Sequence, residues 1–312
     1  MIATMLVVLL AMFVASNAMS ALMAPAFSAI IAESSSADRV ARSFSLSEFS
    51  VLAGLVAGPI AGAALLGVFS IPMLILLTSA VLLLTTSARG WGLQETRRRV
   101  MRAARPRLVT AIDSNVRWYM VAGTLLTVAF SLTFGPYFAI LSRDVWHNSE
   151  AEINLLFAVG NLAAMLGIIL GRLSDRWGGG RVFQLGMFGF GISAIAWGIA
   201  PAWQWGLVPL LIAFGFSEAA FIGQQTLQAA ITEPETRTSV FGITTTVTGV
   251  IGGLGPALGA WLIGVGGNAM PFVAAGIFGV LAVVSAWPIQ VRRQTPSVET
   301  DQQRPGAPVQ AE

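Results

Sequence analysis

Residues 171–181 read GRLSDRWGGGR and lie between two long apolar runs. Three consecutive glycines, Gly178 to Gly180, favour a tight turn at this point. Arg and Asp side chains gathered between two apolar runs are typical of a loop at a membrane surface, and they are unusual in a soluble enzyme. The stretch therefore predicts a short cytoplasmic hairpin between two membrane helices.

The composition of the whole chain agrees with that prediction. Hydrophobic residues make up 55% of the 312 residues and charged residues only 11%, with a mean hydropathy of +0.75. A soluble domain carries about 25% charged residues, so this chain lacks the charge for a water-facing surface. It has no cysteine and one histidine, His147. These counts exclude disulfides, thiolate metal sites and multi-histidine metal sites, and we expect no metal and no cofactor.

Nine stretches are apolar and close to the length of about 20 residues that a helix needs to cross a bilayer. They are residues 5–32, 46–67, 70–87, 118–141, 153–171, 182–200, 205–227, 238–264 and 270–290. A signal peptide is the alternative for 1–32, but this run is too long and has no basic residues at its start. The sequence predicts an all-α integral membrane protein with about nine transmembrane helices.

The basic residues sort by side of the membrane. All 18 are Arg; with nine spans, Arg143 alone falls on one side and the other 17 on the opposite side. Loops rich in Arg stay in the cytoplasm, so the C-terminus is expected there and Met1 outside, in a multi-pass protein of the plasma (cytoplasmic) membrane. The pI near 10.5 also suggests nucleic acid. We expect no such partner, because the Arg positions fit membrane topology better than a binding stripe.

The spans and the polar segments suggest four regions. Residues 1–87 form a partial N-terminal block of three spans, and residues 88–117 an Arg-rich cytoplasmic linker. The linker serves topology and solvation or, alternatively, contacts anionic lipid headgroups. Residues 118–291 form a C-terminal block of six spans. Residues 292–312 are rich in Pro, Gln and Glu, and we expect a disordered tail.

An internal repeat relates the two blocks. The sequence GPIAGA at 58–63 recurs as GPALGA at 255–260, and Phe44 and Phe241 share the same offset. Spans one and two therefore resemble spans seven and eight. Repeated blocks of helices are typical of secondary transporters, so we expect two pseudo-repeated blocks.

The hairpin resembles a motif of the major facilitator superfamily. Gly171, Leu173, Asp175, Arg176 and Gly178 match the pattern G-x-L-x-D-R-x-G of that family, which basic residues follow. Here glycines take the usual basic positions and Arg181 comes one or two residues late. The family carries a stronger copy between helices two and three and a second copy between helices eight and nine. Three spans precede the linker and six follow it, so this hairpin resembles the second copy.

The resemblance implies a helical bundle whose nine spans correspond to helices four to twelve of the family. Gly54, Gly58, Pro59 and Gly62 resemble the helix-five motif associated with proton-coupled export, with Gly255, Pro256 and Gly259 as the counterpart in the repeat. Small residues spaced by four also serve simple helix packing, and both readings stand. Helices one to three are missing, and with them one wall of the central cavity. We therefore expect a native start upstream of Met1 or a fragment.

Glu218 is the leading candidate for a transport residue. It lies about 20 Å inside the span that begins near Trp205, at 1.5 Å per residue. An ionisable side chain inside the bilayer is costly, so a functional role is the first hypothesis: Glu218 binds a cationic substrate or carries the coupled proton. A hydrogen bond to a neighbouring helix is the alternative. Further polar or aromatic candidates at membrane depth are Gln224, Gln225, Asn17, Asn161, Phe134 and Tyr137. Each of the Gln and Asn side chains can instead bridge helices.

Asp175 has a mechanical role in the family, where this carboxylate rests against the N-terminus of a helix in the opposite half. Here that helix is expected to start near Ser43 to Ser45, with Glu48 pairing with Arg42 or Arg176. The alternative is a simple turn in which Asp175 caps the turn and the Arg residues set topology.

Together these features favour a secondary transporter that moves a small molecule by alternating access, through proton-coupled efflux as an antiporter. An importer or facilitator of the same superfamily and a non-transporting truncated fragment are the alternatives. An intramembrane enzyme is disfavoured, because the chain has no HExxH or GxSxG motif and no paired carboxylates in one span. The expected partners are a small-molecule substrate and the lipid bilayer, and no feature demands more than a monomer.

Overall fold

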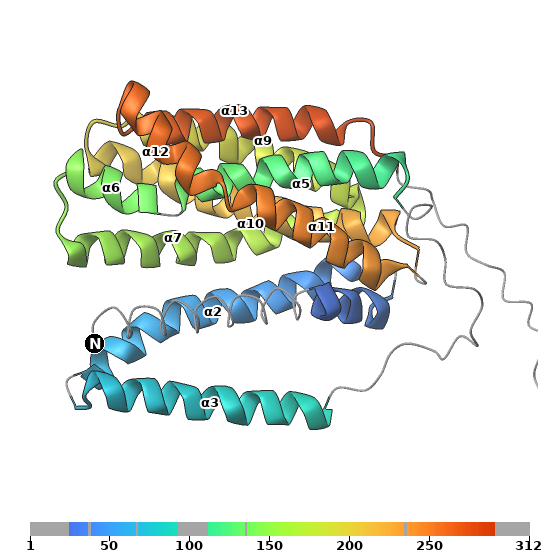
Figure 1. Cartoon of the computed structure of the whole chain (residues 1–312), viewed down its shortest axis with the longest axis horizontal. Helices are drawn as coiled ribbons and strands as arrows, with labels where there is room; N and C mark the ends of the chain where they lie inside the picture. Colours follow the sequence, from blue (N-terminus) through green and yellow to red (C-terminus); the bar gives the residue numbers. More distant parts are fainter. Residues whose placement is uncertain are drawn as a thin grey trace, which may run out of the picture.

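The computed structural model describes residues 25–36, 39–66, 68–92, 112–134, 136–233 and 236–290, and within these ranges the ordered elements are helices (Figure 1). Residues 25–34 are helical and lead into α2. The other helices are α2 (Val40–Leu66), α3 (Ile71–Gly92), α5 (Ser114–Thr133), α6 (Pro136–Asp144), α7 (Glu150–Gly171), α8 (Ser174–Trp177), α9 (Gly179–Gly198), α10 (Trp203–Ile231), α11 (Arg237–Gly252), α12 (Gly255–Gly266) and α13 (Met270–Ala286). The predicted all-α class is confirmed.

Two of the nine expected spans are each divided into two helices. The span 118–141 becomes α5 and α6, which break before Pro136, and the span 238–264 becomes α11 and α12, which break before Pro256. Proline lacks the N–H that continues a helix, so a break just before it is expected. Pro59, in contrast, lies inside the continuous α2. Gly252, Gly253 and Gly255 surround the break before Pro256, and glycine weakens a helix further.

Several helices are suited to a bilayer. In the described part of the chain, five helical segments are long and apolar enough to cross a membrane: Val40–Gly58, Ser114–Asp144, Glu152–Trp177, Trp203–Ile231 and Arg237–Gly266. Two shorter apolar helices accompany them, Met73–Ala88 and Met270–Ala286. Large apolar side chains such as Leu83 and Leu166 are exposed on the outer faces. Such a surface is stable against lipid tails and not against water.

The helices from α5 to α13 pack into one bundle, with α10 at its centre between α9 and α7. The helix α2 lies along α7 and α10, and α3 packs against α2 on the side away from the bundle (Figure 1). We call the residues 25–92 that the structure describes the N-terminal part and α5 to α13 the C-terminal bundle. Because α2 carries the main contacts between them, it is the helix on which any relative movement depends.

Aromatic rings form the centre of the C-terminal bundle. Phe134 meets Phe214 with ring centroids 4.6 Å apart, and Trp197 meets Phe272 at 4.8 Å. Phe190 is fully buried and contacts both Phe130 and Phe134. Edge-to-face aromatic pairs of this kind each contribute about 0.5–1.5 kcal/mol beyond burial. They join α5, α9, α10 and α13 into a rigid unit.

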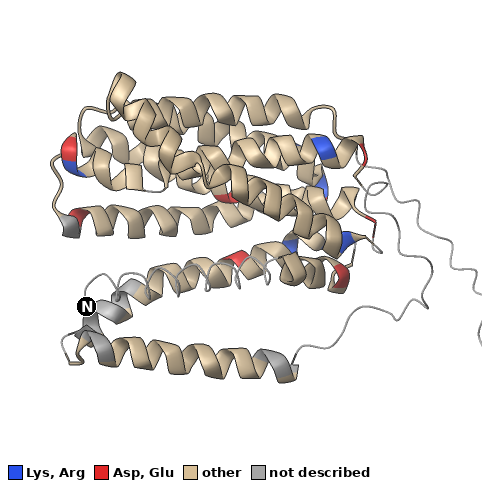
Figure 2. Ribbon diagram, in the orientation of Figure 1, with Lys and Arg blue, Asp and Glu red and all other residues tan. Residues whose placement is uncertain are grey.

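Charged residues in the described ranges gather at the ends of the helices, and few lie at mid-length (Figure 2). This distribution matches the expected placement of the Arg residues in loops. The Arg-rich linker and the C-terminal tail lie largely or wholly outside the described residues. The proposed region boundaries at 87, 117 and 291 stay predictions.

Candidate functional site

The hairpin predicted from GRLSDRWGGGR joins α7 to α9. The helix α7 ends at Gly171, the short helix α8 covers Ser174–Trp177, and α9 begins at Gly179. Gly178 has φ of +85°, a backbone conformation that residues with a side chain rarely adopt. The tight turn that the sequence predicts therefore depends on Gly178.

The other hairpin glycines allow close packing against α10. A Cβ atom at Gly171 would lie 2.5 Å from Ile222, and one at Gly179 would lie 2.5 Å from the backbone nitrogen of Leu227. Arg176 and Arg181 are exposed. The hairpin is thus fixed to α10 on one side and presents its charges on the other.

Asp175 connects the hairpin to the N-terminal part of the chain. Its Oδ1 accepts a hydrogen bond from the backbone N–H of Ala41 at 2.8 Å, and its Oδ2 accepts one from the backbone N–H of Arg42 at 3.1 Å. These amides belong to the first turn of α2, which has no intrahelical partner for them and carries a partial positive charge. The helix starts at Val40, before the Ser43 to Ser45 start expected from the sequence.

Glu218 lies at mid-length of α10 and its side chain is 9% exposed. Its Oε1 has no hydrogen-bond partner. The side chain meets α7, because a Cβ atom at Gly167 would lie 3.0 Å from the Cβ atom of Glu218. A buried carboxylate oxygen without a partner is costly, and native structures keep few such groups outside functional sites.

Gln225 lies two helical turns beyond Glu218 and reaches α2. Its Nε2 donates a hydrogen bond of 3.0 Å to Oε1 of Glu48. The expected pairing of Glu48 with Arg42 or Arg176 is therefore wrong. Both Arg side chains are exposed at the hairpin end, whereas Glu48 lies two turns into α2 and is half-buried against α10.

Gln224, the neighbour of Gln225, faces α5. A Cβ atom at Gly123 would lie 2.7 Å from its Nε2. One turn further along, Gln228 accepts a hydrogen bond of 3.0 Å from the hydroxyl of Tyr119 and donates one to Thr244 of α11. The sequence analysis missed this buried bridge between α5, α10 and α11. The sequence feature that could have pointed to this bridge is the scarcity of tyrosine, because Tyr119 is one of only two tyrosines in the chain.

The other described candidates have partners of their own. The amide of Asn161 donates to the carbonyl of Phe157 in its own helix, at 2.9 Å, so the side chain is satisfied locally. Tyr137 packs on Gly259 and its hydroxyl donates to the carbonyl of Pro256. This contact gives the second GPxxGA copy a packing role, between α6 and α12. Phe134 belongs to the aromatic centre described above. Asn17 lies outside the described residues.

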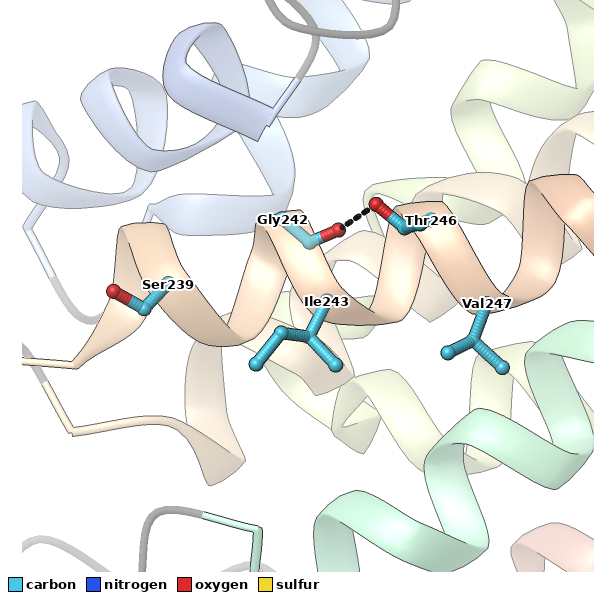
Figure 3. Close-up of a pocket in the computed structure, with 5 residues that line it drawn as sticks. All are labelled: Ser239, Gly242, Ile243, Thr246 and Val247. Carbon is cyan, nitrogen blue, oxygen red and sulfur yellow. Dashed lines mark hydrogen bonds between the residues drawn. The ribbon is translucent and has the colours of Figure 1, made fainter. Parts of the chain in front are cut away.

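The α11 helix carries a shallow groove of about 370 Å³ on one face (Figure 3). It is lined by Ser239, Gly242, Ile243, Thr246 and Val247. The hydroxyl of Thr246 donates to the carbonyl of Gly242 and is thus occupied within the helix. The groove brings no charged side chain together, and it adds no chemistry to the site. Within the described ranges, no three His, Asp or Glu side chains are arranged to hold a metal ion.

Comparison with known proteins decides the family. The sequence model described as Major Facilitator Superfamily matches residues 120–311, which is more than half of the chain. The chain belongs to the major facilitator superfamily. Members of this superfamily are membrane transporters and not enzymes, in agreement with the sequence analysis.

Two solved structures of transporters share the fold. The crystal structure of the human organic anion transporter MFSD10 (TETRAN) matches with a TM-score of 0.69 and 16% identity, over 83% of this chain and 66% of that one. A bacterial homologue of the iron transporter ferroportin, in its outward-facing state, matches with a TM-score of 0.59 and 18% identity, over the same shares. The chain thus spans just under two thirds of the length of these structures. No curated protein sequence matches it.

Two glycines that resemble the helix-five motif of the superfamily, Gly54 and Gly58, have open space around them. A Cβ atom at Gly54 or Gly58 would meet nothing within 4 Å. Pro59 and Gly62 continue α2 without a break. In the described residues, close helix packing at Gly54 and Gly58 is therefore absent, and the export role of the motif stays a prediction. In the repeat counterpart, by contrast, Gly255 and Gly259 pack against Ser131 and Tyr137.

Proposed function

We propose that this member of the major facilitator superfamily is a secondary transporter that moves a small molecule by alternating access, in proton-coupled export. The N-terminal part and the C-terminal bundle move relative to each other, and α2 is the helix across which they separate. The observation that carries the proposal is the contact of Asp175 with the backbone amides of Ala41 and Arg42. Asp175 belongs to the C-terminal bundle and caps a helix of the N-terminal part. This contact can form and break as the two parts move relative to each other.

The strength of this contact suits a switch. A carboxylate at a helix N-terminus contributes about 0.3–1 kcal/mol, and up to about 2 kcal/mol when partly buried. Since 1.4 kcal/mol is a tenfold change in an equilibrium, Asp175 biases the two states by about 2-fold to about 30-fold. That range shifts the equilibrium without locking the chain in one state.

Glu218 supplies the coupling in this proposal. It is buried at mid-length of α10, and one of its oxygens has no partner, so it is suited to gain and lose a proton during the cycle. Gln224 and Gln225 lie about two turns further along α10, on the faces toward α5 and α2. On the basis of the Arg distribution, we place the hairpin and the C-terminus in the cytoplasm and the protein in the plasma membrane. We propose a monomer because no sequence feature demands a larger assembly.

Replacement of Asp175 by Asn tests the switch. The amide keeps the shape of the side chain but removes its charge, and one of its two terminal atoms becomes a donor that faces another N–H. We expect flux to slow by several-fold, up to about 30-fold, with a smaller change in the amount of protein in the membrane. Flux is measured in proteoliposomes with a pH gradient, using ethidium as a cationic probe and carboxyfluorescein as an anionic probe.

The control for this variant is Asp144→Asn, which changes an exposed carboxylate that pairs with its neighbour Arg143. We expect wild-type flux from it. Equal losses of flux and of membrane protein in Asp175→Asn would make Asp175 a residue of the turn only. No flux of either probe in the wild-type chain would count against export of these two classes of ion.

A further inference from the structure

The α2–α10 interface brings two acidic side chains together at membrane depth. Glu48 of α2 and Glu218 of α10 belong to helices that contact each other, and the Glu48 carboxylate binds Gln225, which lies seven residues beyond Glu218 on α10. No pairing of these two residues is visible in the sequence, where 169 positions separate them. We name them the carboxylate pair.

The two members of the pair are held differently. Oε1 of Glu48 accepts the 3.0 Å hydrogen bond from Gln225, whereas Oε1 of Glu218 is buried without a partner. Seven residues, or two helical turns, separate Glu218 from Gln225, so both point from the same face of α10. The unpartnered oxygen of Glu218 therefore lies on the side of α10 that also receives Glu48.

In the residues that the structure describes, neither Glu48 nor Glu218 makes an ion pair. Helix α10 contacts α2, α5, α7, α8 and α9, and its Gln228 also binds Thr244 of α11. Among their described charged groups, Glu48 binds the face of α10 that carries Glu218. The others lie at the two ends of the bundle or bind elsewhere: Arg42, Arg172, Asp175, Arg176 and Arg181 at the hairpin, Arg117 and Glu152 exposed near the first turns of α5 and α7, Tyr119 on Gln228, and Arg237 of α11 on the carbonyl of Ala229.

Two carboxylates in one poorly solvated interface cannot both stay ionised without a compensating charge. We propose that Glu48 and Glu218 form one site that binds a single positive charge, which closes the α2–α10 contact. That charge is a proton or the cationic group of a substrate. The proposal rests on the proposed transport function and adds a second residue and a ligand class to it.

The site couples charge to position, because its two carboxylates come from different parts of the chain. When the positive charge leaves, repulsion between Glu48 and Glu218 opposes the α2–α10 contact. When it binds, the contact closes and Gln225 holds Glu48 in place. The distance between α2 and α10 therefore reports whether the site holds a positive charge.

The absence of cysteine makes this separation directly measurable. Ser50→Cys on α2 and Ala230→Cys on α10 place spin labels at two exposed positions near the contact. The labelled full chain is reconstituted in lipid nanodiscs, and label distances are measured by pulsed electron paramagnetic resonance at about pH 5 and about pH 9. Tetraphenylphosphonium, a permeant organic cation, is then added at the higher pH.

We expect the distance distribution to shift to longer values at the higher pH, because ionisation of both carboxylates restores their repulsion. Reversal of this shift by tetraphenylphosphonium identifies an organic cation as a source of the charge, and a shift that responds to pH alone identifies the proton. In Glu48→Gln and in Glu218→Gln the shift is lost. Glu48→Asp keeps the charge and regains part of the shift, which separates a charge effect from misfolding. Asp144→Asn behaves as the wild type.

Two results overturn the carboxylate pair: a distance that responds to neither pH nor tetraphenylphosphonium in the wild type, and a pH shift that persists in Glu48→Gln. Flux assays distinguish this failure from failure of the transport proposal. A wild-type chain that shifts with pH but moves neither probe keeps the site and loses export. A chain that transports and loses no coupling in Glu48→Gln keeps export and loses the site.

Discussion

Glu218→Gln is expected to abolish coupled flux while the protein stays folded. Glutamine has nearly the same shape as glutamate, so the packing of α10 against Gly167 of α7 is preserved. It cannot exchange a proton and carries no charge to bind a cation. Because it also removes a buried group whose charged form is costly in a bilayer, we expect no loss of stability.

The measurement combines two signals in one set of proteoliposomes. Pyranine trapped inside reports proton movement, and the fluorescence of ethidium or carboxyfluorescein reports substrate. In the wild type the two signals rise together, and in Glu218→Gln both fall to the level of empty vesicles. The control is Glu152→Gln, which alters an exposed carboxylate at the start of α7. Unchanged coupled flux in Glu218→Gln would refute the role of Glu218.

Gly167→Ala is expected to have the largest effect on stability. The added methyl group would overlap the backbone carbonyl oxygen of Gly215 in α10, and a backbone atom cannot move aside without moving its helix. Overpacking of a close contact costs about 1–3 kcal/mol, and more where helices must separate. We expect the thermal unfolding temperature in detergent to fall by about 2–10 °C.

Gly54→Ala is the matched control for this variant. The substitution is the same and the position is also inside a helix, but a methyl group there meets nothing within 4 Å. Alanine has a helix propensity about 0.8–1 kcal/mol better than glycine, so this control is expected to unfold at the same or a higher temperature. Equal unfolding temperatures for the two variants would show that the α7–α10 contact adapts to the added group.

The membrane spans could be predicted from the sequence because the pattern that identifies them is local. A run of apolar residues identifies a membrane helix whatever it packs against. The nine expected spans overlap described helices, although two spans are each divided into two helices and the first is described only in part. The break before Pro136 has a local cause, because proline lacks the N–H that continues a helix. The break before Pro256 was not expected, because the same Gly-Pro pair in α2 leaves that helix continuous.

The pairing of side chains across helices was not accessible in the same way. Charge alone suggested Arg partners for Glu48, yet the rotation of α2 places it against Gln225 of α10. The position of Gly167 against Gly215 and the bridge from Tyr119 through Gln228 to Thr244 depend on helix rotation and depth. The sequence of an apolar span predicts neither the rotation nor the depth of its helix, because a helix surrounded by lipid and protein has no strong polar face to fix its orientation.

Gln224 and Gln225 are neighbours in the sequence, yet one meets α5 and the other meets α2. Successive residues of an α-helix point about 100° apart, so this pair spans the gap between two neighbours of α10. Rotation of α10 about its own axis therefore displaces both amides at once. It cannot improve the contact of one amide without distorting the contact of the other. Rotation of α10 therefore couples the position of α2 to that of α5. This coupling needs no direct contact between α2 and α5.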